Sequence, residues 1–443
     1  MVFLIKACQL LLSLSILVIL HEFGHYIAAR LFKIRVEKFY LFFNPWFSIL
    51  KKKIGNTEWG IGWLPLGGYV KISGMIDESM DKEQMSKPPQ PWEFRSKPAW
   101  QRLIVMIGGV VVNLILGILI YIFVVFSWGE EQVQTKNLNH GLNIHQSLAK
   151  YNINNGDNII AINNKEVKHI NDINNGLLLR NYRELRVKHK NGTVESITLP
   201  DNIDYELFEA GAFPVVTLQS YAIVQSVNPG SIAENAGFVK GDEIRKIKQE
   251  TVYYGDIQPI LRENAGKTIT VDIIRDGQEM TINTPVGSDS LIGFSYNIES
   301  FIEKDKIQTV YYSFLGSIGR GMNRGLNTLG DYVAQLKFLF TKKGATSLGG
   351  FGAIGNLFPA QWDWQKFWLN TALISIILAF MNILPIPALD GGHVVFLLYE
   401  IITGKEAPQK ILEYAQYVGF FILISLLIYA NGNDLYRAIF GGF

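Results

Sequence analysis

The sequence predicts a polytopic α-helical membrane protein with about four transmembrane helices, a membrane-associated β-hairpin or sheet, and two small α+β modules. Two observations predict this class. Strongly apolar runs, long enough to cross a hydrocarbon core of about 30 Å, alternate with polar segments of ordinary composition. A sequence pattern also occurs twice within the longest polar segment, as in a duplicated domain. At 443 residues, the chain is too long for one compact core.

The overall composition excludes some classes of partner and of site. The 41 Lys and Arg residues are nearly balanced by 39 Asp and Glu, for a formal net charge of +2. We therefore expect no nucleic-acid partner. The single cysteine, Cys8, excludes both an intrachain disulfide and a cysteine-based zinc site. We expect a monomer in a lipid bilayer.

Four segments are expected to span the membrane. The first, residues 1–31, is not followed by a small-x-small cleavage site, so we expect a membrane span rather than a cleaved signal peptide. The second, 103–127, contains Asn113 as its one strongly polar residue. The third and fourth, 366–392 and 414–431, carry Trp and Tyr residues near their ends, where aromatic side chains favour the membrane interface.

The loop between the first two spans, 32–102, is basic. From Arg30 to Arg102 it contains thirteen Lys and Arg residues against seven Asp and Glu. Because basic residues near span ends are retained in the cytoplasm, we expect this loop to be cytoplasmic. The segment after the second span opens with Glu130 and Glu131. We expect that segment and both chain termini on the opposite side.

The repeated pattern predicts two α+β modules, 128–200 and 215–290. Each copy contains a glycine followed by an aspartate, Asp157 in the first and Asp242 in the second, before an apolar strand. Turn signals and alternating strands follow both copies. A duplicated structural domain that binds no ligand is the alternative interpretation.

A further helix is expected over 298–345. Apolar residues recur there at three- and four-residue spacing between Val310 and Phe340, which indicates one apolar helical face. Lys and Arg residues are interspersed, so the sequence predicts an amphipathic, membrane-associated helix. This helix can lie on the membrane surface or pack on the spans, and packing against protein is the more common arrangement.

The strongest chemical signal is an H-E-x-x-H motif in the first span. Residues four apart share one helical face, so His21 and His25 can face one metal ion while Glu22 flanks it. Zinc suits two imidazoles and a carboxylate, leaves a fourth place for water, and lowers the pKa of that water to about 7. Glu22 can then act as the general base in peptide hydrolysis. Ionisable groups at membrane depth cost at least ~2.5–3.5 kcal/mol each, which favours a functional explanation.

The third protein ligand must come from elsewhere in the chain. Ala28 and Leu31 occupy positions where a metzincin would have Gly and His, and Glu37 is the only acid before a strand-like segment. A better candidate is Asp390, which closely follows two prolines that end an apolar helix. Helix capping is the alternative role for this carboxylate.

These motifs resemble those of the site-2 protease family of intramembrane zinc metalloproteases. Its two signatures are matched by the H-E-F-G-H run in the first span and by N-x-x-P-x-P-x-L-D-G-G at the end of the third. Residues 64–71 resemble its membrane-entering β-hairpin. The run from Gly109 to Asn113 resembles its G-x-x-x-N motif, with Val110 where close relatives often have proline. The two repeats point to the regulator-of-sigma-E protease branch, in which they are periplasmic PDZ domains.

The resemblance implies the roles of several residues. It implies that His21, His25 and Asp390 bind Zn²⁺ and that Glu22 is the catalytic base.

The resemblance also implies substrate contacts. Asn382 is expected beside the metal, holding the extended substrate chain. Gly67, Gly68 and Tyr69 belong to a loop with an edge strand that can pair with a substrate by strand addition. Asn113 is either a substrate contact or a structural polar residue of its span.

The sequence therefore predicts a zinc metalloendopeptidase that hydrolyses peptide bonds within membrane spans, in regulated intramembrane proteolysis. By the resemblance, the protein is a multi-pass protein of a bacterial inner membrane with periplasmic PDZ-like modules. The implied substrates are single-span anti-sigma factors already trimmed outside. Two alternatives are a non-proteolytic PDZ scaffold with a zinc site and a membrane-anchored zincin acting on soluble peptides.

Overall fold

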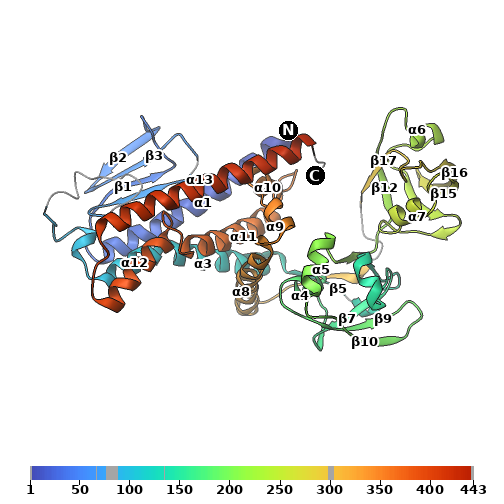
Figure 1. The fold of residues 1–443 in the computed structure, drawn as a ribbon, viewed down its shortest axis with the longest axis horizontal. Coiled ribbons are helices and arrows are strands. Elements are labelled where there is room, and N and C mark those ends of the chain that lie inside the picture. The colour runs from blue at the N-terminus through green and yellow to red at the C-terminus, as the bar shows by residue number, and fades with distance from the viewer. Residues whose placement is uncertain (1, 66, 76–87, 134, 298–303, 441–443) are drawn as a thin grey trace. The chain divides into compact units, whose positions relative to one another are not determined.

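The computed structural model describes residues 2–65, 67–75, 88–133, 135–297 and 304–440. The chain forms two compact units (Figure 1). The first combines Met1–Gly129 with Tyr311–Phe443, and the second is Glu130–Val310. Each unit is described by itself.

Four helices of the first unit are long and apolar enough to cross a membrane: α1 (Val2–Leu31), α3 (Ala99–Trp128), α11 (Trp364–Ile383) and α13 (Gln409–Phe440). They confirm the expected number of spans within the described part of the chain. Both α3 and α13 extend beyond the expected ranges, 103–127 and 414–431.

The expected third element, 366–392, contains a span that ends before two prolines, as predicted, and the start of a second helix. Helix α11 ends at Ile383, and a separate helix, α12 (Asp390–Thr403), begins at Asp390. Pro385 and Pro387 separate the two helices, because proline has no backbone N–H and disfavours helical geometry in the residue before it. Asp390 therefore lies at the start of a new helix.

Helices α1 and α3 pack with their backbones in close approach. A β-carbon on Gly24 of α1 would lie 2.4 Å from the carbonyl oxygen of Gly108 in α3. A β-carbon on Gly108 would lie 2.7 Å from the carbonyl oxygen of Gly24. Small residues commonly permit such contacts between membrane helices. Helix α3 also packs against α11 and α12 and is thus the central helix of this unit.

A four-stranded sheet follows α1, where a membrane-associated β-hairpin or sheet was expected. Its strand order is β2 (Leu50–Ile54), β3 (Thr57–Ile61), β1 (Val36–Leu41), β4 (Tyr69–Ile72). Strand β1 is parallel to β3 and antiparallel to β4. The expected edge strand is thus present as β4. Within the expected loop 32–102, residues 66 and 76–87 lie outside the described residues.

Helix α8 (Phe314–Leu339) packs on the spans. Its Gly321 and Gly325 lie against Ile122 and Ile118 of α3. The helix begins later than the expected range 298–345, because strand β18 (Ile307–Val310) precedes it. Residues 298–303 lie outside the described residues. The short helices α9 (Lys342–Thr346) and α10 (Phe351–Asn356) follow.

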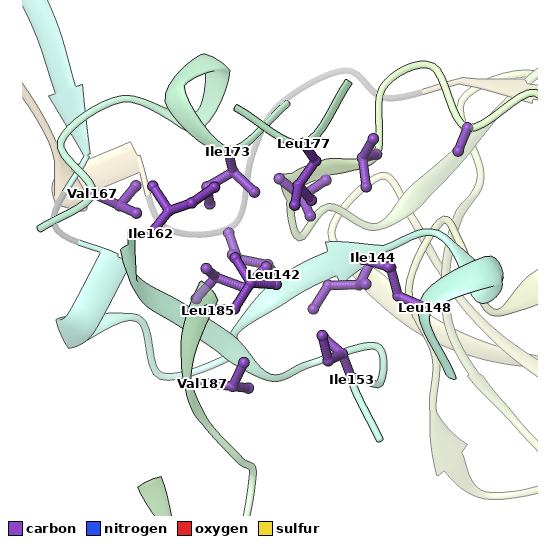
Figure 2. Close-up of a cluster of buried hydrophobic side chains, with 14 of the residues drawn as sticks. Leu142, Ile144, Leu148, Ile153, Ile162, Val167, Ile173, Leu177, Leu185 and Val187 are labelled. Atoms are coloured by element: carbon purple, nitrogen blue, oxygen red, sulfur yellow. The ribbon is translucent and has the colours of Figure 1, made fainter. Parts of the chain in front are cut away.

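The first module of the second unit encloses one apolar core, shown in Figure 2. That core continues through Ile203 and Leu207 to Leu218, so the expected end at residue 200 is too early. The last strand of the module pairs with an early one, which binds the segment beyond 200 to this core. Its elements are β5 (Glu130–Val133), β6 (Leu142–Ile144), β7 (Asn158–Ile162), β8 (Lys165–Glu166), α4 (Ile170–Leu178), β9 (Glu184–Lys188), β10 (Val194–Thr198), α5 (Ile203–Ala210) and β11 (Val216–Leu218).

The second module has its own sheet and core. Its range differs from the expected 215–290, because β11 belongs to the first module and the last strand of the second ends at Asn297. Its strands are β12 (Ala222–Val227), β13 (Glu243–Ile247), β14 (Glu250–Thr251), β15 (Thr268–Arg275), β16 (Gln278–Pro285) and β17 (Phe294–Asn297), with helices α6 (Ile232–Ala236) and α7 (Ile257–Glu263). Strand β18 then pairs with β5 and returns the chain to the first unit.

The repeated aspartate is Asp157 in the first module and Asp242 in the second, and each forms an ion pair with a different type of cation. In the second module, Arg275 binds Asp242 at two points, with Nε–Oδ1 2.6 Å and Nη2–Oδ2 2.7 Å. In the first, His189 Nδ1 lies 3.1 Å from Asp157 Oδ2, and its Nε2 lies 3.1 Å from Glu195 Oε2. The strand registers place His189 and Arg275 at equivalent positions. The residue after each aspartate, Asn158 or Glu243, pairs with the residue just before the cation, Lys188 or Ile274.

The first module thus depends on a group that titrates. Burial opposes the charge on His189, but the hydrogen bonds to Asp157 and Glu195 outweigh it and raise the pKa of the imidazole. The Lys190 side chain lies over Gly156 and adds a second cation near the turn. Arg275 stays charged throughout the same pH range.

We predict that the first module loses stability as pH rises. Protonated His189 contributes fully below its unfolded-state pKa of about 6.5, and the contribution is lost as pH rises through the raised folded-state pKa. The expected loss is on the order of 1 kcal/mol, since Glu195 is half exposed. Hydrogen exchange of the full-length protein, corrected for intrinsic rates, should show β7 losing protection relative to β13.

The substitution His189→Arg copies the second module and should remove this pH dependence. Equal pH responses of β7 and β13 in the unsubstituted protein would contradict the prediction.

Candidate metal centre

Helices α1 and α12 bring three metal-ligand side chains together. His21 and His25 lie one helical turn apart on α1, and Asp390 is the first residue of α12. Their ligand atoms all lie within 4.8 Å of one another. The side chains are largely buried, with exposed fractions of 12%, 7% and 16%. The structure therefore assembles all three of the predicted ligands.

The spacing of the three ligand atoms fits zinc. The Nε2 atoms of His21 and His25 are 3.3 Å apart, and Asp390 Oδ2 lies 3.3 Å and 3.4 Å from them. Tetrahedral ligands at about 2.0–2.1 Å from a zinc ion are separated by about 3.3–3.4 Å. Three such electron-rich atoms repel one another at this distance unless a cation or proton lies among them. Two imidazoles and a carboxylate are also a donor set that zinc accepts.

A backbone carbonyl fixes the orientation of His25. Its Nδ1 lies 2.8 Å from the carbonyl oxygen of Val105 in α3. A proton on Nδ1 donates to that oxygen, which leaves the lone pair of Nε2 directed at the metal position.

Asn113 lies beside the other imidazole. Its side-chain Nδ2 is 3.2 Å from His21 Nδ1, and its Oδ1 is buried without a hydrogen-bond partner among the described residues. A half-turn of the amide brings Oδ1 to the imidazole, where it accepts the Nδ1 proton that a metal-binding His21 must carry. The geometry favours orientation of His21 over the substrate contact considered for Asn113. Asn382, in contrast, has its Nδ2 3.4 Å from His21 Nε2, on the metal side.

A tight turn places Asp390. Ala388 adopts a left-handed backbone conformation, with φ of 73°. A β-carbon on Gly391 would lie 2.1 Å from the carbonyl oxygen of Leu384, so this turn accepts only glycine there. Gly392 packs in the same way against the backbone of Pro387. The two glycines after the aspartate therefore allow α12 to start directly under the end of α11.

Strand β4 lies beside Glu22, the glutamate of the H-E-x-x-H motif. A β-carbon on Gly68 would lie 2.7 Å from Val18 and 3.5 Å from the Glu22 side chain. The backbone N–H of Val70 lies near the Glu22 carboxylate. Strand and helix are thus in direct contact next to the metal position.

The other hairpin positions pack within the sheet. The Tyr69 ring stacks on Tyr40, with centroids 5.3 Å apart, and its hydroxyl donates to Asn44 Oδ1 at 2.9 Å. Gly67 lies against the Phe43 ring. These contacts give the Tyr69 side chain a role in building the sheet, whereas the β4 backbone forms its edge.

Gly109 is a site residue that the sequence analysis considered only as part of a motif. A β-carbon there would lie 2.5 Å from His25 Nε2 and 2.6 Å from His21 Cε1. The adjacent Gly108–Gly109 pair in an apolar span was the available signal, but the sequence does not show which partner helix it faces. The Val105 carbonyl carries no sequence signal at all.

Comparison with known proteins identifies the family. The family model described as Peptidase family M50 matches residues 9–426. This chain belongs to Peptidase family M50, the site-2 protease family. It is therefore a zinc metalloendopeptidase of membranes, and zinc is its cofactor.

Bacterial relatives match this chain along nearly its whole length. "Regulator of sigma E protease" of Haemophilus influenzae is 28% identical, over 99% of this chain and 100% of the relative. "Protease RseP" of Yersinia pestis is 26% identical, over 96% and 97%. "Putative zinc metalloprotease RSc1411" of Ralstonia nicotianae is also 26% identical, over 96% and 97%.

We predict that Asn113→Leu weakens zinc binding by about 10–100-fold, because His21 loses the group that orients it. Titration of the purified protein with a competing chelator measures the zinc dissociation constant. Asn370→Leu is the matched control, since Asn370 donates to the Leu357 carbonyl away from the site. Unchanged zinc affinity in Asn113→Leu would show that this amide does not orient the imidazole.

We predict that Gly109→Ala loses most of its zinc. The added methyl would overlap both imidazoles, and helix backbones cannot yield by the required distance. Elemental analysis of the folded, purified variant tests this. Gly330→Ala on α8 is the control, because a β-carbon there meets nothing within 4 Å. A normal zinc content in Gly109→Ala would refute the prediction.

Proposed function

We propose that the protein hydrolyses peptide bonds within the transmembrane segments of single-span proteins, with His21, His25 and Asp390 as zinc ligands and Glu22 as the base. One observation carries the proposal. Three metal-ligand side chains and the glutamate converge inside a bundle of apolar spans rather than on a polar surface. A substrate bond must therefore reach the site at membrane depth.

Each residue has a defined task in this reaction. A zinc ion held by His21, His25 and Asp390 would polarise the substrate carbonyl and lower the pKa of the attacking water. Glu22 takes a proton from that water and passes it to the leaving amine. The nearby N–H of Val70 favours the charged form of the Glu22 carboxylate. Asn382, beside His21, is positioned to donate its amide to the extended substrate chain.

The substrate helix must unwind before it can be cut. Free backbone groups in lipid cost several kcal/mol each, so the enzyme must replace the hydrogen bonds of the helix. The edge strand β4, which contacts Glu22, is suited to this by strand addition. Gly68, at its start, packs against Val18 and the backbone of Tyr40 and so brings the strand close to Glu22.

We infer that the natural substrate is an anti-sigma factor already trimmed outside the membrane. The name "Regulator of sigma E protease" of a full-length relative supports this assignment. We further propose that the modules of Glu130–Val310 are PDZ domains in the periplasm, and that the basic loop 30–102 is cytoplasmic in the inner membrane. The sequence repeat and the excess of basic residues in that loop support these assignments.

We predict that Glu22→Gln abolishes cleavage while zinc stays bound, since the base is not a ligand. The assay co-reconstitutes the enzyme with a trimmed single-span substrate and maps the cut by mass spectrometry. In the unsubstituted enzyme, the cut should lie within the apolar run. A cut in a water-exposed tail would favour a membrane-anchored zincin. If the unsubstituted enzyme binds zinc but does not cut the substrate, a non-proteolytic scaffold would be favoured.

A further inference from the structure

The edge of the sheet opposite β4 carries an exposed patch that the proposed catalysis does not use. All five residues of β2 are exposed, and the loop before it exposes 91% of Trp46 and 58% of both Phe47 and Ile49. The outer-edge patch is defined here as Trp46, Phe47, Ile49, Leu50, Lys51, Lys52 and Lys53. It joins three consecutive cations to four large apolar side chains.

The contacts of β4 with α1 show the depth of the sheet. Strand β1 begins directly after α1 ends, and its first residue, Val36, pairs with Ile72. At its other end, Tyr40 pairs with Tyr69, which follows the glycine that contacts Glu22. Strand β1 therefore runs from the end of α1 back toward the catalytic level. Figure 1 shows the sheet at the end of α1 opposite the N-terminus.

The pairing of β3 with β1 and of β2 with β3 shows which end of β2 lies toward Glu22. Strand β3 is parallel to β1, and Leu50 of β2 pairs with Ile61 at the end toward the catalytic level. Lys53 pairs with Glu58, nearer the end of α1. At about 3.3 Å per residue, Leu50 and Lys53 are about 10 Å apart along the strand. The apolar members of the patch thus point toward the bilayer interior, and the lysines follow toward its surface.

The cations of the patch have no ion-pair partner within the part of the chain that the structure describes. Among the residues that the structure describes, none forms an ion pair with Lys51, Lys52 or Lys53. The nearest carboxylate in register, Glu58, instead accepts a hydrogen bond from the Tyr40 hydroxyl at 2.7 Å. Three uncompensated charges at the membrane surface favour an anionic ligand.

The aromatic members are held in place rather than loose. Trp63 stacks on Trp46 and Phe47, with centroids 6.1 Å and 5.8 Å apart, and its Nε1 donates to the Pro45 carbonyl at 2.8 Å. Rigid aromatics beside lysines are typical of the membrane interface. An acidic soluble protein would satisfy the charges but leave the aromatic surface in water.

We propose that the outer-edge patch binds anionic phospholipid, with the aromatic side chains at the acyl-chain boundary and Lys51–Lys53 on the headgroup phosphates. The inference does not rest on proteolysis. Because β2 and β4 are opposite edges of one sheet, bound lipid would hold the strand beside Glu22 at a fixed depth.

The test measures which lipid lies next to Trp46 in the full-length protein. The protein is reconstituted in vesicles of phosphatidylglycerol and phosphatidylcholine at one fixed ratio, and only one lipid carries bromine in its acyl chains. Bromine quenches nearby tryptophan, and the Trp46 signal is obtained by difference from Trp46→Phe. Each lysine near an anionic surface strengthens binding by about fivefold (about 1 kcal/mol). We therefore expect at least about fivefold stronger quenching from brominated phosphatidylglycerol.

The triple substitution Lys51→Gln, Lys52→Gln, Lys53→Gln should abolish this preference. The control substitution Lys240→Gln, Lys246→Gln, Lys267→Gln removes the same charge from the second module and should leave it intact. Equal quenching by both brominated lipids, or a preference that survives the first triple substitution, would overturn the proposal. Absence of quenching by either lipid would also overturn it, and would favour a protein partner for the patch.

Discussion

The close contact between α1 and α3 is the constraint on which the site depends. At Gly24 and Gly108 no side chain separates the two helices, and their backbones touch. Only at this separation can the imidazole of His25 reach the carbonyl of Val105, and His21 reach Asn113. Helix α12 packs on the same α3, so α3 also sets where Asp390 meets the histidines. A wider contact would separate the ligands from their orienting groups and from one another.

The candidate metal ligands could be predicted from the sequence because their signals are local. Two histidines four apart share a helical face by the geometry of the helix alone, and an acid after two prolines at membrane depth has few explanations. The structure brings His21, His25 and Asp390 together as expected. The groups that orient the ligands were harder to assign. Asn113 was visible as a polar residue in a span, but its partner depends on how α3 faces α1.

Features that depend on contacts between distant segments were predicted less well. A β-hairpin or sheet was expected after the first span, but its strand order was not, because the inner strand β1 pairs with β3 and β4 across long connections. The first module was expected to end at residue 200, because the repeat covers only its first strands. Strand β11 joins that module by pairing with β6, a contact without a local signal. The break between Ile383 and Asp390 was readable from the prolines, but it was placed inside one expected element.

The separation of the ligands along the chain has a consequence for biosynthesis. His21 and Asp390 meet in the fold, yet the whole unit Glu130–Val310 is inserted between the helices that carry them. A nascent chain that has inserted only α1 and α3 holds two imidazoles without the carboxylate from α12. Such an intermediate has no complete site with which to cut itself, the insertion machinery or neighbouring membrane proteins. The order of translation therefore keeps the protease inactive until its catalytic helices have all been made.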